Sequence, residues 1–128
     1  MRVRTRALLA ICCIALAGSS AASGPTTAQQ LRSEISPQDL KALRKNMAEI
    51  KSPIRWPAAQ QDRYRNICLK QKAEESSLNA RTCDCYLELM MNRYGTFGDY
   101  ATDIMETGAP QDQKTQVLIG ACLAAFGD

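Results

Sequence analysis

The sequence predicts an all-α fold: a small, disulfide-stapled bundle of about five helices. Apolar residues recur every three or four positions in several segments, which is the spacing of one face of a helix. Residues that begin or end helices flank these segments, and no segment shows the alternation of apolar and polar residues that is typical of a strand. Four cysteines that can cross-link the helices follow the N-terminal region: Cys68, Cys83, Cys85 and Cys122.

Residues 1–23 have the three parts of a cleavable signal peptide. Three arginines come first, an apolar stretch follows at 7–18, and small residues come next. The apolar stretch is shorter than the roughly 20 residues that a membrane-spanning helix needs. Cys12 and Cys13 in this stretch lack the preceding small residue that is typical of lipid attachment. We therefore expect cleavage, a periplasmic or secreted location, and no stable membrane insertion of the mature protein.

The charge of the mature protein differs from that of the precursor. The chain has 16 lysines and arginines against 13 aspartates and glutamates, and three of the arginines belong to the signal peptide. The mature protein is therefore close to neutral, which predicts no nucleic-acid binding. Most of the charged residues in 41–72 are basic, and most of those in 73–128 are acidic. Two interpretations remain open: the two halves attract each other within the fold, or the basic half forms a face for an acidic partner.

The folded domain is predicted to occupy residues 36–128. Residues 24–35 begin with a small, polar, proline-containing stretch, which predicts a disordered lead-in. The first helix begins after Ser36, whose hydroxyl can cap it, and continues to Ile50 with apolar residues at helical spacing. We expect this helix to be loosely attached, because it contains no cysteine.

A linker is predicted over residues 51–56. Pro53 and Pro57 bias the residues before them away from the helical conformation. Helical spacing, caps and glycine stops then predict four more helices, at about residues 57–75, 80–94, 97–107 and 110–126. Thr96 is the expected cap of the fourth helix, and Pro110 is expected to open the last one.

The spacing of Cys83 and Cys85 restricts how the helices can be linked. Positions two apart on a helix point about 200 degrees away from each other, so these two cysteines cannot bond together without breaking the helix. Each must reach a different neighbour, which makes the third helix a hub between the helices of Cys68 and Cys122. Two pairings meet this condition, and the sequence leaves the choice between them open.

We predict that the protein is not an enzyme and has no cofactor or metal site. The chain lacks histidine, the commonest general base and a common metal ligand. Asp99, Asp103 and Glu106 form the best carboxylate cluster, and we interpret it as a solvated helix face. Asp84 and Glu88 form a similar pair, four positions apart on the hub helix, with the same interpretation. The cysteine spacings match no zinc-site pattern, and an oxidising compartment favours disulfides.

The candidate binding residues are Lys41, Arg44, Lys45 and Trp56. The three cations fall on the polar side of the first helix, and the tryptophan lies between two prolines in the linker. Clustered charge beside an aromatic residue is a common composition of protein interfaces. A second interpretation stays open, in which Trp56 packs into the bundle as its largest core residue and the cations are only solvated.

The layout of one cysteine, a Cys-x-Cys pair and a fourth cysteine, centred on Cys83-Asp84-Cys85-Tyr86, resembles that of small exported helical proteins of Gram-negative bacteria. In size, export and helical disulfide-bonded character alone, the chain is also similar to periplasmic immunity proteins that neutralise type VI secretion amidases. These resemblances imply a non-catalytic exported module that binds an unidentified protein partner, such as an inhibitor or immunity protein. The alternative is a soft-metal-binding or thiol redox protein that uses the Cys-x-Cys pair.

Overall fold

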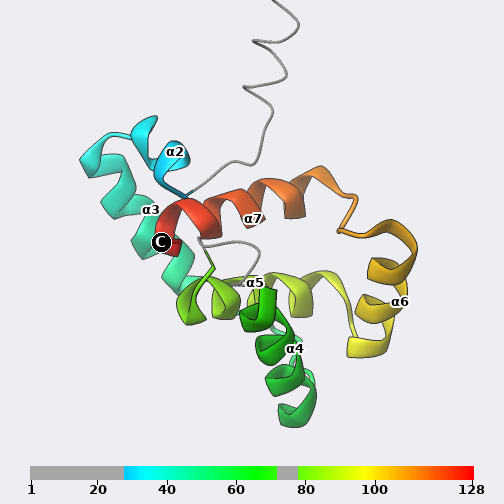
Figure 1. The fold of residues 1–128 in the computed structure, drawn as a ribbon. Coiled ribbons are helices and arrows are strands. Elements are labelled where there is room, and N and C mark those ends of the chain that lie inside the picture. Colours follow the sequence, from blue (N-terminus) through cyan, green and yellow to red (C-terminus); the bar gives the residue numbers. More distant parts are fainter. Residues whose placement is uncertain (1–27, 72–77) are drawn as a thin grey trace, which may run out of the picture.

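The described part of the protein is built only from helices. The computed structural model describes residues 28–71 and 78–128, and no strand occurs in them (Figure 1). These residues form α2 (Ala28–Ser33), α3 (Pro37–Glu49), α4 (Ala58–Lys70), α5 (Ala80–Arg93), α6 (Phe97–Thr107) and α7 (Gln113–Phe126). The all-α prediction is confirmed, with one helix more than expected. The predicted signal peptide and the end of the second predicted helix lie outside the described residues.

Helix α5 lies at the centre of the bundle. It packs against α7 and α4, and Figure 1 shows it between these two helices. Because both partners cover it, its buried residues are not confined to one stripe. The buried residues of α5 are Thr82, Cys83, Cys85, Leu87, Glu88, Leu89, Met90 and Met91. None of the described helices combines the length and the apolar character needed to cross a bilayer.

Two disulfides fasten α5 to its neighbours. Cys68 of α4 is bonded to Cys83, and Cys85 is bonded to Cys122 of α7, with Cα–Cα distances of 5.9 and 5.8 Å. The hub prediction is confirmed, and the pairing that the sequence left open is resolved. In the chain-entropy model, loops with these sequence separations of 15 and 37 correspond to about 3 and about 4 kcal/mol of stabilisation.

Side-chain caps fix where several helices begin. The hydroxyls of Ser36 and Thr96 accept hydrogen bonds from the first turns of α3 and α6, as predicted. The start of α7 differs from the prediction, because it lies three residues after Pro110. The Asp112 carboxylate accepts bonds from the backbone N–H and the hydroxyl of Thr115, at 3.0 and 2.6 Å, and this cap sets the start.

The prediction of a disordered lead-in over residues 24–35 needs a correction, because α2 lies within it. Arg32 Nη1 donates a hydrogen bond to the carbonyl of Gly127 at 2.6 Å. Ala28 is fully buried, and a Cβ on Gly127 would lie 2.7 Å from the Cβ of Ala28. The glycine thus permits the close approach of α2 to the end of α7. Such a short helix depends on these tertiary contacts, because six residues are too few to be helical alone in water.

The end of α7 is held by three side chains from other segments, a set that we call the α7 clamp. It consists of Arg32 bound to the carbonyl of Gly127, Arg44 to that of Ala125, and Asn79 to that of Phe126. The last carbonyls of a helix lack partners within the helix, so donors from elsewhere satisfy them. Because Arg44 belongs to α3, and Met47 of α3 is buried, the expectation that this helix is loosely attached is wrong.

Aromatic rings fill the space between the linker, α4 and α6. The ring of Trp56 makes edge contacts with Tyr64, Phe97 and Tyr100, at centroid distances of 6.2, 5.5 and 5.6 Å. Such pairs contribute about 0.5–1.5 kcal/mol each beyond the burial of their area. Trp56 itself is only 2% exposed. The structure agrees with the second interpretation, in which Trp56 is a core residue of the bundle.

Candidate functional site

The four candidate binding residues do not form one surface. Lys41 and Lys45 are exposed on α3. The guanidinium of Arg44 donates its Nε–H to the carbonyl of Ala125 at 2.9 Å, so it is occupied in the α7 clamp. Trp56 is buried in the aromatic core, so the idea of an exposed aromatic anchor is corrected. Of the three predicted cations, Lys41 and Lys45 are the two that have no hydrogen bond or ion pair to a described residue.

A groove lies along the face of α5 that is nearest to the end of α3. We call it the α5 groove; it has a volume of about 320 Å³. Its floor is made of buried or half-buried apolar side chains: Met47, Ile50, Leu87 and Phe126. Charged side chains surround the floor: Lys51, Arg55, Arg65, Arg81, Asp84 and Glu88. An apolar floor with polar groups around it is the usual composition of a binding pocket.

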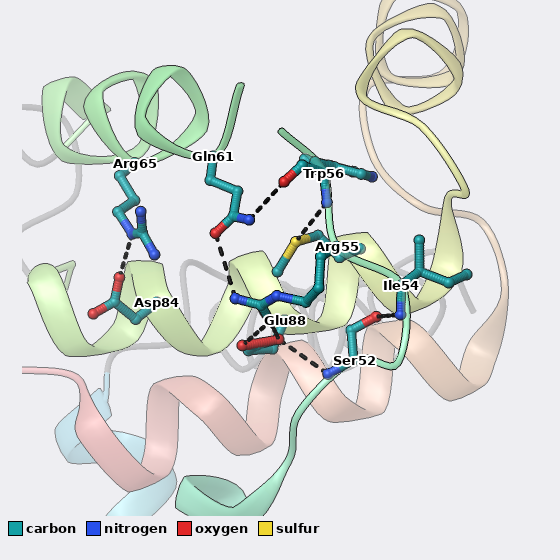
Figure 2. Close-up of polar contacts among 9 residues, drawn as sticks. Ser52, Ile54, Arg55, Trp56, Gln61, Arg65, Asp84 and Glu88 are labelled. Carbon is teal, nitrogen blue, oxygen red and sulfur yellow. Dashed lines mark hydrogen bonds and ion pairs between the residues drawn. The ribbon is translucent and has the colours of Figure 1, made fainter. Parts of the chain in front are cut away.

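The carboxylate of Glu88 holds the linker against α5. Arg55 Nη1 donates to both carboxylate oxygens at 2.6 and 2.7 Å, and the backbone N–H of Ser52 donates to Oε2 at 3.0 Å (Figure 2). Burial by itself would raise the pKa of Glu88. The hydrogen bonds from Arg55 and Ser52, with the charges of Arg55 and Lys51, outweigh that effect, so the pKa lies below its ordinary value. Glu88 is therefore ionised at neutral pH, and the linker has a fixed charged attachment.

The polar groups of Trp56 fix the other end of the linker. Its indole N–H donates to the carbonyl of Tyr94 at 3.0 Å, and its backbone N–H donates to the sulfur of Met91 at 3.5 Å. The side chain of Gln61 donates to the carbonyl of Trp56 at 2.7 Å (Figure 2). A buried tryptophan with all its polar groups bonded is anchored in one position. The linker wall of the α5 groove is therefore preformed.

Ion pairs across the α5 groove join the basic and the acidic parts of the chain. Arg55 binds Glu88, and Arg65 Nε donates to Oδ1 of Asp84 at 2.8 Å. These pairs agree with the interpretation that the two parts attract each other within the fold. Lys51 and Arg81, also in the groove, have no carboxylate partner among the described residues. Within the described part of the chain, the groove therefore combines two paired acids with two cations that lack a carboxylate partner.

The ring of Phe126 and the guanidinium of Arg81 form one corner of the groove. The guanidinium carbon of Arg81 lies 4.6 Å from the ring centroid, which is the geometry of a cation–π contact. This contact leaves the donors of the guanidinium unused by any described acceptor. Arg81 is exposed, whereas Phe126 is half-buried, so the charge lies at the opening and the ring lies deeper.

Of the carboxylate cluster on α6, Asp103 bonds the residue that ends α5, whereas Asp99 and Glu106 are exposed. Asp103 accepts a hydrogen bond from the hydroxyl of Tyr94. Burial raises the pKa of Tyr94 to about 12, and the bond to Asp103 adds to this shift. Asp99 takes part in the first turn of α6, where its backbone N–H bonds the Thr96 cap. In the parts of the chain that the structure describes, no three carboxylate or cysteine side chains gather where they could hold a metal ion.

The Cys-x-Cys pair is oxidised in this structure. Cys83 and Cys85 each belong to a different disulfide, and both are buried. A thiolate is the form that binds soft metals and attacks disulfides. The alternative function of a soft-metal or redox site would therefore require reduction of a buried disulfide first.

Comparisons with known proteins found no match: no protein-family model, curated protein or solved structure is similar to this chain. The resemblance of the cysteine layout therefore stays a prediction. Sequence reasoning missed Ser52 and Arg55, which shape the groove, and its interpretation of Glu88 as part of a solvated face was wrong, because Glu88 is buried. One signal pointed to Glu88: it is the only charged residue in the apolar run 87–91. A lone carboxylate in such a run must be buried with a partner or interrupt the core.

Proposed function

We propose that this protein is a non-catalytic exported module that binds a protein partner through the α5 groove. The observation that carries the proposal is the composition of the groove: an apolar floor beside Lys51 and Arg81, two cations that have no carboxylate partner within residues 28–71 and 78–128. Apolar floors that are rimmed by charge are typical of binding sites, where the floor supplies affinity and the charges supply orientation. A periplasmic inhibitor or immunity protein is one form that such a module takes.

Two further features support a role outside the reducing cytoplasm. Residues 1–23 have the order of a signal peptide, and two disulfides join the helices of the folded domain. Disulfides persist in oxidising compartments and are rare in the cytoplasm. Export and a stapled domain fit a binding protein of the periplasm or the extracellular space.

The proposed surface overlaps in part with the one that the sequence predicts. The groove is lined by the end of the first predicted helix, through Met47 and Ile50, and by the linker, through Arg55. Lys41 and Lys45, exposed on the same helix, can raise the rate of encounter with an acidic partner without contacting it. Arg44 and Trp56 contribute by holding the walls rather than by contact with a partner.

Photo-crosslinking tests the proposal directly. A benzophenone side chain replaces Ala48, an exposed residue that lines the groove, or Gln113, an exposed control residue at the start of α7. We expect a discrete protein adduct from Ala48, and none from Gln113, in the cells that export the protein. No adduct at Ala48, or equal adducts at both positions, would reject binding through the groove. A parallel titration for free thiols should find none in the folded domain, because all four of its cysteines are bonded.

A further inference from the structure

We propose that the α5 groove selects an acidic segment of its protein partner, one that also carries an apolar side chain. In this proposal, carboxylates of the segment pair with Lys51 and Arg81, and the apolar side chain lies on the floor against Ile50 and Phe126. The inference rests on the proposed function, because it names the chemistry of the partner at the same site.

When the ion pairs inside the groove are subtracted, its remaining charge is positive and is complementary to an acidic ligand. Glu88 is bonded by Arg55 and Ser52, and Asp84 by Arg65, so an arginine of the groove balances the charge of each carboxylate. Among the described residues, Lys51 acts on Glu88 through its charge but forms no hydrogen bond or ion pair, and Arg81 has a cation–π contact with Phe126 but no hydrogen bond or ion pair. Within the described residues, the charges of the groove that remain for a partner are therefore positive.

The placement of the paired acids favours a polypeptide over a nucleic acid. Asp84 and Glu88 occupy Arg65 and Arg55, so a continuous phosphate backbone would meet only Lys51 and Arg81 as cations without a carboxylate partner among the described residues. Arg81 lies over the ring of Phe126, the one aromatic ring among the described lining residues, so a base would have to displace the guanidinium to stack on that face. A peptide can place isolated carboxylates at Lys51 and Arg81 and avoid both acids.

The floor requires an apolar group as well as charge. Met47 is buried and Ile50 is half-buried, so the floor offers little to a purely charged ligand. A volume of about 320 Å³ is at the small end of the range of about 300–1,000 Å³ for ligand pockets, and it fits a few side chains. Methionine adapts its shape to different apolar partners, so the floor can accept more than one kind of aliphatic side chain.

Titration of the isotope-labelled mature protein with short capped peptides tests the inference by NMR. The probe peptide is Gly-Glu-Leu-Glu-Leu-Gly; one control peptide has Gln for each Glu, and another has Ser for each Leu. The protein variants are Lys51→Glu with Arg81→Glu, and the matched control Lys114→Glu, an exposed lysine of α7 outside the groove. The readout is the shift of backbone amides at Ala48, Lys51 and Cys85.

We expect saturable shifts with a Kd at or below about 1 mM for the acidic peptide, and weaker binding for both control peptides. The double variant should bind about tenfold more weakly or worse, since attraction becomes repulsion at two positions, while Lys114→Glu should bind normally. Equal binding of the Gln peptide, or an unaffected double variant, would overturn the inference. Shifts that grow with protein concentration without peptide would do the same, because they would assign the groove to a second copy of the chain.

The two proposals fail separately. If the Ala48 adduct forms equally well in the Lys51→Glu, Arg81→Glu protein, the groove binds a partner that is not selected by charge, and only the inference is rejected. If no adduct forms in the unaltered protein, the proposed function is rejected whatever the peptides do.

Discussion

The α7 clamp and the α5 groove use the same kind of side chain for opposite purposes. In the clamp, Arg32 and Arg44 donate to main-chain carbonyls at 2.6 and 2.9 Å, and their charge stabilises the negative end of the α7 dipole. In the groove, Lys51 and Arg81 have no acceptor among the described residues. The role of a basic residue here depends on which acceptor the fold places before it, and not on the neighbouring residues in the sequence.

The two regions also differ in how their backbone is held. The clamp holds the end of a regular helix, α7, whereas one wall of the groove is a linker without helical hydrogen bonds. That wall is fixed instead by Trp56 in the aromatic core and by the Glu88 carboxylate. A binding surface that is fixed before the partner arrives loses less conformational entropy on binding. The wall should therefore depend on the buried contacts behind it, and the clamp on part-buried hydrogen bonds to the end of α7.

Replacement of Trp56 by alanine should have the largest effect. Loss of a buried tryptophan leaves a cavity among Tyr64, Phe97 and Tyr100 and an unbonded carbonyl at Tyr94. The free energy of unfolding should fall by about 3–5 kcal/mol, measured by urea denaturation. Ile54→Ala, in the same linker but 38% exposed, is the control and should cost less than about 1 kcal/mol. Equal effects would mean that the linker is not anchored by its tryptophan.

Glu88→Gln should have an intermediate effect that depends on pH. The folded pKa of Glu88 is lower than its ordinary value near 4.5, so the ionised form is favoured by folding. The stability that it contributes is therefore fully present above that ordinary value and is lost as the pH falls through the lowered pKa. At pH 7 the substitution should cost about 1–3 kcal/mol, because a charge-assisted bond to Arg55 and a bond to Ser52 are weakened.

As the pH falls through the lowered pKa of Glu88, the variant and the unaltered protein should approach the same stability, since Glu88 becomes protonated in both the folded and the unfolded state. Asp112, whose pKa is lowered to about 2 by its bonds to Thr115 and Arg93, titrates in the same acid range. Asp112→Asn is therefore the control, and its pH dependence should add to that of Glu88→Gln. A cost that is constant from pH 3 to pH 7 would show that Glu88 does not act through its charge.

The parts of the fold that follow from local chemistry could be predicted from the sequence. The starts of α3 and α6 follow from the hydroxyls of Ser36 and Thr96, and the hub role of α5 follows from the opposite directions of Cys83 and Cys85. The helix α2 could not be predicted, because it depends on a bond between Arg32 and Gly127, 95 residues apart. Its sequence alone gives no stable helix.

The candidate site was less predictable for the same reason. Glu88 bonds residues 33 and 36 positions earlier, and only the folded chain brings Ser52 and Arg55 to it. The sequence pattern placed the cations of α3 on a polar face, which is correct for Lys41 and Lys45. It could not show that Arg44 lies opposite the last turn of α7, since helix packing decides which residues of a polar face meet an acceptor.

The smallest expected effect separates the clamp from the groove most sharply. Arg44→Met keeps much of the aliphatic bulk but removes the donor to the Ala125 carbonyl and the charge near the end of α7. It should cost about 1–2 kcal/mol of unfolding free energy, because a C-terminal carbonyl loses its partner. Lys51→Met removes a cation that acts on Glu88 through its charge but makes no hydrogen bond or ion pair with a described residue, so it should change stability by less than about 0.5 kcal/mol. Thermal unfolding at low salt measures the stability of both variants, and the Ala48 adduct reports binding.

The clamp variant should lose stability and keep the adduct, whereas the groove variant should keep its stability and lose the adduct. If both variants behave alike, the two sets of cations do not have separate roles, and the assignment of Lys51 to partner binding falls with that distinction.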